Sequence, residues 1–188
     1  MNRWLFAAAL VAMAVVRAPH VRRSVRVPVA TNRETRVDRT LVVGVGIGMA
    51  LGVVWLCGAL GFADRPHSPA ATGLGGALLA GGLVLLHCCH RDLGTNWSNT
   101  LVLRSGHALV TCGIYRRVRH PMYLALLLYG LGQALVVENL LAGPGFFVPF
   151  AALVALRLPA EERMLHERFG EAWTAYAAGS WRLVPWIW

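Results

Sequence analysis

The sequence predicts an all-α integral membrane protein with about five transmembrane helices and a C-terminal amphipathic helix. Three observations favour this fold class. The chain of 188 residues is 56% hydrophobic with a mean hydropathy of +0.53, which is too apolar for a water-soluble domain of this size. Several apolar runs approach or exceed the ~20 residues with which a helix crosses a bilayer. All 18 basic residues are arginine, and most of them lie between these runs.

Five apolar runs are interpreted as the membrane helices. The first is short and is expected to be tilted or partly inserted. We interpret it as a retained helix, because its flanks lack the basic start and the small-residue cleavage site of a signal peptide. Prolines near the start of the fifth run predict a kinked or late-starting helix. The runs are Trp4–Val16, Leu41–Ala63, Ala70–Cys89, Leu124–Val137 (about 17 residues counted from Pro121) and Leu140–Leu158.

Small residues recur at helical spacing in the second and third runs. Gly44, Gly48 and Gly52 lie on one face, and Gly73 and Gly81 begin and end a similar stripe with Ala77 between them. Such stripes allow two membrane helices to approach closely. With only the short polar turn 64–69 between them, the two runs are expected to form a tightly packed antiparallel hairpin.

The arginines predict which segments share one side of the membrane. Seven lie in 17–39, a segment expected to be a loop or to lie on the surface; five lie in 91–119 and four from 157 onward. Only Arg3 and Arg65 fall on the other side. Since basic loops stay in the cytoplasm, all three segments are expected there. The segments 90–120 and 157–188 are therefore free to meet.

The C-terminal part of the chain differs in pattern from the apolar runs. Four glutamates alternate between 159 and 178 with Leu165, Phe169, Trp173 and Tyr176, which is typical of an amphipathic helix. The end of the chain, 181–188, holds three tryptophans and is expected to anchor at the membrane interface. The organisation is that of a single membrane domain, with the chemistry expected in 90–188 and the N-terminal helices in 1–89.

Polar groups at a membrane border are candidates for function, because they are costly to place there. One side brings His107, Tyr115, Arg119, His120 and Tyr123, and the other brings Arg157, Glu161 and Glu162. From these residues alone, an ion-pair network that anchors the last helix is an equally good interpretation. The four cysteines fit no disulfide framework, and we interpret the sequence from His87 to His90 as a helix end without a metal.

These motifs, in their order, resemble the isoprenylcysteine carboxyl methyltransferase family, part of a wider group of integral-membrane methyltransferases that includes phospholipid methyltransferases. The resemblance rests on Gly113-x-Tyr115, on Arg119-His120-Pro121-x-Tyr123, and on Glu161-Glu162-x-x-Leu165-x-x-x-Phe169-Gly170 with Tyr176 beyond it. It covers roughly residues 90–188. It implies S-adenosyl-L-methionine as the methyl donor, in a cytosol-facing site closed by the C-terminal helix.

The resemblance also implies roles for single residues. Arg157 would face the substrate, with Arg119 as the alternative, and Glu162 is the candidate base for an acceptor that must lose a proton. A carboxylate acceptor is already ionised at neutral pH and needs only a cation to hold it. The donor contacts would be His107, Ala108, Leu109, Val110, Tyr115, His120, Pro121, Met122, Tyr123 and Glu161.

We therefore expect carboxyl O-methylation of a lipophilic or lipidated, isoprenylcysteine-like substrate that enters from the bilayer, by a monomer surrounded by membrane lipids. N-methylation of a phospholipid amine and S-methylation of a thiol remain alternatives. An NADPH-dependent sterol-type reductase would have asparagine where this chain has Met122. A small transporter or scaffold would not explain Tyr115, His120 and Glu161 on one predicted face. Nucleic-acid binding is disfavoured, because the arginines lie in loops between membrane helices.

Overall fold

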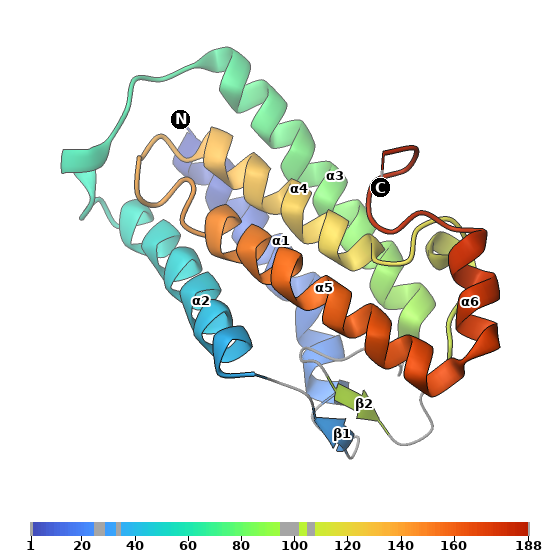
Figure 1. Cartoon of the computed structure of the whole chain (residues 1–188). Helices are drawn as coiled ribbons and strands as arrows, with labels where there is room; N and C mark the ends of the chain where they lie inside the picture. The colour runs from blue at the N-terminus through green and yellow to red at the C-terminus, as the bar shows by residue number, and fades with distance from the viewer. Residues whose placement is uncertain (1, 25–28, 33–34, 95–101, 105–107, 188) are drawn as a thin grey trace.

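The computed structural model describes residues 2–24, 29–32, 35–94, 102–104 and 108–187 (Figure 1). In this part of the chain the structure is a bundle of helices with one short two-stranded sheet. The helices are α1 (Asn2–Ser24), α2 (Arg36–Leu56), α3 (Pro69–Leu93), α4 (Pro121–Val136), α5 (Phe147–Phe169) and α6 (Glu171–Ala178). Strands β1 (Val29–Asn32) and β2 (Val102–Arg104) and the 3-10 turns η1 (Gly61–Ala63) and η3 (Gly113–Arg116) connect them.

The long helices pack in two pairs that meet through α4 and α5. Helix α3 lies beside α4, and α2 lies beside α5 (Figure 1). Helix α1 packs against α3 and α4. The core between them contains fully buried side chains from α1, α3, α4 and α5, among them Phe6, Leu86, Tyr129 and Leu158. This arrangement brings the start of α4 next to the second half of α5, where the candidate site lies.

Two glycines allow α3 and α4 to approach closely. A Cβ atom added to Gly75 would lie 2.9 Å from the carbonyl oxygen of Gly132, and one added to Gly132 would lie 2.7 Å from that of Gly75. Both separations are shorter than real Cβ contacts, so any side chain here would push the helices apart. Close backbone approach of this kind is how helices associate in lipid.

The predicted hairpin of the second and third helices is wrong. Helix α2 packs on α5 and α3 packs on α4. Gly48 does mark a close contact, but its neighbour is the backbone of Gly145, and a Cβ at Gly73 or Gly81 would meet nothing within 4 Å. A stripe of small residues indicates a face that can be approached, but not the helix that approaches it.

Helix α1 is longer than the apolar run predicted. Residues from Arg17 onward were expected to form a loop or a segment lying on the membrane surface, but the helix continues through Pro19 to Ser24. Arginine is a good helix former, and Arg22 and Arg23 in the last turn interact favourably with the negative end of the helix dipole. The apolar core and the basic end therefore form one continuous helix.

Helix α5 also differs from the prediction. A separate amphipathic helix was expected to begin at Pro159, but α5 runs through this proline to Phe169. Gly170, with φ of +55°, ends α5, and α6 follows directly. Glycine tolerates such a backbone angle because it has no Cβ atom. Arg157 and Glu161 therefore lie one turn apart on a single helix, and the late start of this helix at Phe147 is confirmed.

Three helices in the described part of the chain are long and apolar enough to cross a membrane: Arg3–Arg23, Arg36–Leu56 and Pro69–Leu93. Helix α4 is apolar but shorter, with 16 residues. The outer face of α2 exposes large apolar side chains, including Val43 and Ile47, which are each 57% exposed. An apolar surface of this extent suits lipid rather than water. The protein is an integral membrane protein.

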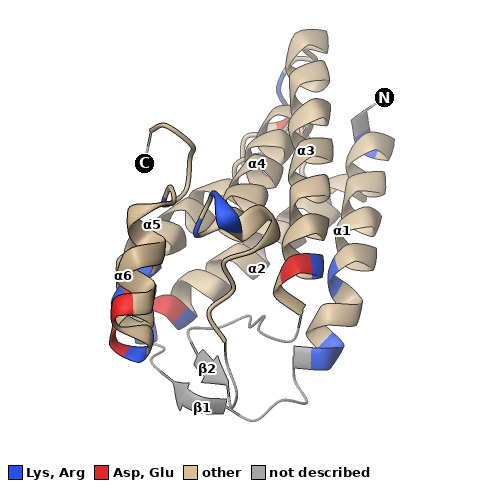
Figure 2. Ribbon diagram, turned by 90° about the vertical axis from the view of Figure 1, so that its right-hand side faces the viewer, with Lys and Arg blue, Asp and Glu red and all other residues tan. Residues whose placement is uncertain are grey.

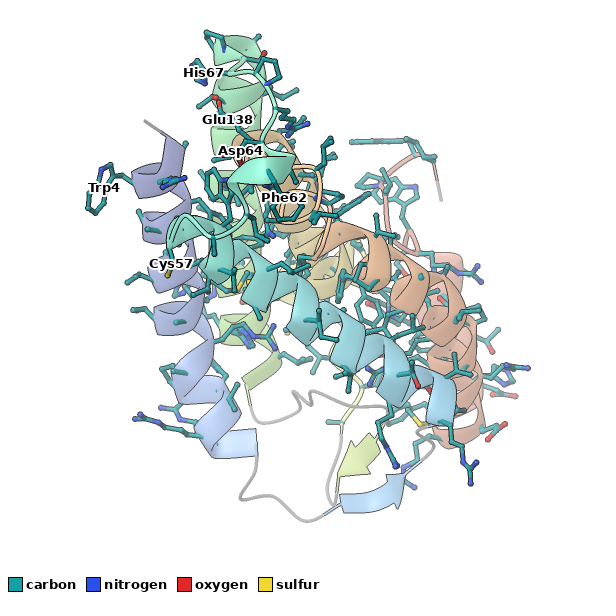
Figure 3. The ribbon with its side chains drawn as sticks, turned by 90° about the vertical axis from the view of Figure 1, so that its left-hand side faces the viewer. Trp4, Cys57, Phe62, Asp64, His67 and Glu138 are labelled. Atoms are coloured by element: carbon teal, nitrogen blue, oxygen red, sulfur yellow. The ribbon has the colours of Figure 1, made fainter. Side chains whose placement is uncertain are left out.

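A hydrogen-bond network closes the end of the bundle where η1 meets the turn after α4. One oxygen of Asp64 accepts hydrogen bonds from Trp55 Nε1 and Asn139 Nδ2, both at 2.9 Å. His67 contacts Glu138 beside it, and Figure 3 shows Asp64, His67 and Glu138 together at this end. The hydrogen bonds from Trp55 and Asn139 hold the pKa of Asp64 below its ordinary value, so the carboxylate stays ionised.

The opposite end of the bundle gathers the arginine-rich segments. Strand β1 pairs antiparallel with β2, with Val29 opposite Arg104, so the loop after α1 meets the segment after α3. Most of the charged residues lie in this half, on α6, at the end of α3 and in the last turns of α1 (Figure 2). The predicted meeting of these segments on one side is confirmed. That this side faces the cytoplasm remains a prediction.

Candidate functional site

The candidate site is built around the first turn of α4. His120 precedes the helix and Pro121 is its first residue, a position that suits proline because no N–H is needed there. The approach to α4 lies beside the C-terminal segment, residues 179–187. The backbone N–H of Arg119 donates to the carbonyl of Trp181 at 2.8 Å, and that of His120 donates to Arg182 at 3.1 Å. The chain end is thereby fixed against the start of α4.

Arg119 and Glu162 join three segments of the chain. Arg119 Nε donates to Glu162 Oε1 at 2.9 Å, and its Nη1 donates to the carbonyl oxygens of Ala177, at 2.8 Å, and Ser180. Arg182 Nη2 lies 2.6 Å from the other Glu162 oxygen. We call Arg119, Glu162 and Arg182 the clasp. It ties the start of α4 and the middle of α5 to the C-terminal segment.

The Glu162 carboxylate is held strongly ionised. Burial alone would raise its pKa, but the nearby His120 ring and the hydrogen bonds from Arg119 and Arg182 outweigh burial and lower the pKa to about 2. His120 Nε2 lies 3.4 Å from Glu162 Oε1. A carboxylate surrounded in this way by donors and positive charge is a poor proton acceptor.

Glu161 belongs to a different environment from its neighbour. The Tyr123 hydroxyl donates to Glu161 Oε2, while Oε1 lies 4.0 Å from His120 Nδ1. The rings of His120 and Tyr123 stack, with centroids 5.7 Å apart and planes 15° apart. The Glu161 side chain is 27% exposed. The result is an accessible carboxylate beside two aromatic faces.

Tyr115 lies on the same side of the bundle, in the turn η3. Its side chain is buried, and its carbonyl accepts a hydrogen bond from the Tyr176 hydroxyl of α6 at 2.6 Å. Burial, together with the nearby Cys89 and the negative charge of Glu161, raises the pKa of Tyr115 well above its ordinary value. Burial also raises the pKa of Tyr176 to about 12. Both tyrosines therefore remain neutral and can only stack or hydrogen-bond.

Arg157 is the buried cation of the site, with 6% exposure. It interacts electrostatically with Asp38, from the first turn of α2, and with Tyr123. Asp38 is 8% exposed, and its carboxylate caps α2 by accepting from the backbone N–H of Thr35 at 2.9 Å. Arg157 thus has a negative partner in the N-terminal half of the chain, which sequence reasoning missed.

The structure brings most of the predicted site residues together. Those at the junction are Tyr115, Arg119, His120, Pro121, Tyr123, Arg157, Glu161 and Glu162. Met122 packs toward the bundle core, and Pro121 is fully buried. Ala108, Leu109 and Val110 form an irregular segment ahead of η3, with only Ala108 exposed. His107 lies outside the described residues.

Three further residues shape the site and were not among the predicted ones: Asp38, Asp92 and Arg182. The sequence carried a signal for the first of them, since Thr35 and Asp38 have the spacing of a helix capping box. Asp92 accepts a hydrogen bond from the backbone N–H of Ile114, and Arg182 belongs to the clasp. Both roles depend on tertiary contacts, so no local sequence pattern indicates them.

The family model described as the isoprenylcysteine carboxyl methyltransferase family matches residues 75–167. This range includes α4, most of α5, and every candidate site residue from His107 to Glu162. It excludes Asp38 and Arg182.

Relatives and a solved structure are also similar to this chain. Protein-S-isoprenylcysteine O-methyltransferase A of Arabidopsis thaliana is 35% identical over 81 residues, which span 43% of this chain and 41% of that protein. A probable protein-S-isoprenylcysteine O-methyltransferase of Oryza sativa subsp. indica is 26% identical over 98% of this chain and 96% of its own length. The structure of the eukaryotic intramembrane Ras methyltransferase shares the fold, with a TM-score of 0.59 at 22% identity over 99% of this chain and 68% of that one.

Proposed function

We propose that this chain, which belongs to the isoprenylcysteine carboxyl methyltransferase family, is an S-adenosyl-L-methionine-dependent methyltransferase that O-methylates a carboxylate on a lipophilic substrate. The observation that carries the proposal is the junction of α4 with α5. There an accessible carboxylate, Glu161, lies beside the stacked rings of His120 and Tyr123, and Arg157 is the buried cation close by.

The residues at this junction suit a sulfonium donor. The donor carries a positive sulfur, an amine, a carboxylate and ribose hydroxyls, and when bound it supplies an electrophilic methyl group. Faces of aromatic rings attract cations, by about 0.5–2 kcal/mol according to desolvation. Tyr123 presents such a face, with His120 stacked on its ring, and Glu161 can accept hydrogen bonds from an amine or from hydroxyls. Tyr115, kept neutral by burial, would contribute a further ring.

Arg157 is the residue that we assign to the acceptor. A guanidinium can hold a carboxylate through two parallel hydrogen bonds, which fixes the nucleophilic oxygen in direction. Transfer of a methyl group is an in-line displacement, so positioning of this kind contributes much of the rate. The negative charge of Asp38 would balance the positive charge of Arg157 until the acceptor binds.

The state of Glu162 favours a carboxylate over an amine as acceptor. An ammonium group must lose a proton before it can attack, and Glu162, the candidate base, has a pKa of about 2. A carboxylate needs no base because it is already ionised. We therefore assign Arg119 and Glu162 to holding the C-terminal segment rather than to touching the acceptor.

The membrane arrangement belongs to the same proposal. We assign five crossings to α1 to α4 and to the part of α5 before Pro159, with the basic end in the cytoplasm, because that end holds most of the arginines. An acceptor with an isoprenoid or similar chain would then enter sideways from the bilayer, and α6 with the C-terminal segment would close the donor site from the cytoplasm. We expect the protein to act as a monomer.

A screen of acceptors with a donor carrying a labelled methyl group tests the proposed function. Purified protein in detergent is given lipophilic substrates that end in a carboxylate, an amine or a thiol, on the same isoprenoid chain. Labelled, base-labile ester formed only from the carboxylate is the expected result. Transfer only to the amine or the thiol would reject carboxyl methylation while keeping the enzyme class, and no transfer to any of them would reject the enzyme class.

A further inference from the structure

The end of α3 is bonded directly to the turn that carries Tyr115. The Asp92 side chain is 9% exposed, and its Oδ2 accepts a hydrogen bond from the backbone N–H of Ile114 at 2.8 Å. Its Oδ1 accepts from Arg91 Nε at 2.7 Å. Both carboxylate oxygens are therefore engaged, one by an exposed neighbour and one by η3. The proposed roles of Arg157 and Glu161 do not involve this contact.

Gly113 makes the contact possible. Its φ is +59°, and a Cβ added to it would overlap the Asp92 carboxylate. Only glycine combines this backbone angle with room for the carboxylate. The Gly113-x-Tyr115 pattern is therefore explained by packing on Asp92: glycine lets the carboxylate reach the backbone N–H of the residue before Tyr115.

Tyr115 lies between this contact and the proposed donor site. Its buried side chain interacts with Cys89, one turn before Asp92 on α3, and with Glu161 on α5. Its carbonyl is bonded to Tyr176 of α6. Displacement of η3 from α3 would therefore move a side chain that interacts electrostatically with Glu161.

We propose that Asp92 is a positioning residue for the donor site, which holds η3 against α3 and thereby sets the place of the Tyr115 ring. The inference rests on the proposed function, because it takes Tyr115 as a donor contact. Asp92 itself touches neither donor nor acceptor. Asp92 is expected to affect donor affinity only when Tyr115 is present. A general contribution of Asp92 to folding would not depend on Tyr115 in this way.

The test is a double-mutant cycle on donor affinity, measured by calorimetry on purified protein in detergent. Asp92→Ala removes the acceptor for the Ile114 N–H and is expected to weaken binding of S-adenosyl-L-methionine about tenfold, the size of one charge-assisted hydrogen bond. Asp92→Asn keeps an acceptor oxygen and should recover affinity to within about threefold. In a Tyr115→Leu background, Asp92→Ala should change affinity less than about twofold.

Arg91→Gln is the matched control, since it removes the other partner of Asp92 and leaves η3 bound; its donor affinity should equal that of the wild type. Equal losses from Asp92→Ala with and without Tyr115, or no loss at all, would overturn the positioning role. If Asp92→Ala does not unfold cooperatively, the cycle is run with Asp92→Leu, which fills a similar space without an acceptor oxygen, under the same criterion. A wild-type protein that binds no donor would reject the proposed function itself, so the two failures are distinguishable.

Discussion

The guanidinium of Arg119 donates to the carboxylate of Glu162 at 2.9 Å, which joins residues 43 positions apart in the chain. Both side chains are largely buried, with 11% and 13% exposure. Arg119 also binds two carbonyls near the end of α6, and Glu162 also binds Arg182. One ion pair therefore fixes the start of α4, the middle of α5 and the C-terminal segment together, next to Glu161 and Tyr123.

Glu162→Gln should destabilise the protein and weaken donor binding together. The change leaves Arg119 and Arg182 without their shared anion, and removing one partner of a buried ion pair costs about 3 kcal/mol. Thermal unfolding in detergent and donor calorimetry measure the two effects. Glu171→Gln, at an exposed position of α6, is the control and should change neither. A Glu162→Gln protein of wild-type stability would disprove the clasp.

The contribution of Glu162 to stability should depend on pH in a defined window. The folded-state pKa of about 2 lies below the ordinary value of 4.5, so the unfolded chain takes up this proton first as pH falls. The stabilisation is thus complete above about pH 4.5 and is lost towards pH 2. The stability difference between wild type and Glu162→Gln, measured by thermal unfolding from pH 7 to pH 3, should be constant down to about pH 5 and shrink below it. A difference that does not change with pH would contradict the assigned pKa.

Arg157→Lys should lower turnover while leaving donor affinity intact. Lysine keeps the charge but loses the two-pronged hydrogen bonding that orients a carboxylate. The value of kcat/KM for the acceptor is expected to fall on the order of tenfold to a hundredfold. Arg163→Lys, at an exposed position of the same helix, is the control. If Arg157→Lys lowered donor affinity by the same factor as kcat/KM, Arg157 would be a contact of the donor and not of the acceptor.

Asp38→Asn should strengthen the binding of an anionic acceptor. The substitution keeps the shape and an acceptor for the Thr35 N–H, but it removes the negative charge that competes for Arg157. The acceptor KM is expected to fall about threefold, the size of a partly screened charge pair. Steady-state kinetics against a carboxylate acceptor measures the effect. A raised KM would mean that Asp38 holds Arg157 in its working position.

The sequence predicted the membrane class and the meeting of two distant segments, because both follow from composition and from where the arginines lie. It also predicted the start of α4, where proline marks the first helical residue after the polar approach. The partner of each helix was not predictable, since a stripe of small residues permits close packing without specifying the neighbouring helix. Gly48 indicated a close contact, and only the fold shows that Gly145 makes it.

The two residues of the Glu161-Glu162 pair illustrate how far the site could be predicted. Both were placed at the junction correctly, but their different surroundings depend on contacts with side chains and carbonyls of other segments. Glu162 faces Arg119 and Arg182, while Glu161 faces Tyr123. Asp38 was missed for a related reason: it lies far from the motifs in sequence, and only the packing of α2 on α5 brings it near Arg157.

Donor calorimetry on the wild type and on Glu161→Ala tests the central claim most directly, because Glu161 is the accessible carboxylate beside the His120 and Tyr123 rings. Wild-type protein should bind S-adenosyl-L-methionine in the absence of any acceptor. Glu161→Ala should bind it at least about tenfold more weakly, the loss of a charge-assisted contact, while Glu171→Ala, at an exposed position of α6, should bind it as the wild type does. Absence of binding by the wild type, or equal affinity in Glu161→Ala, would contradict a donor site at the junction of α4 and α5.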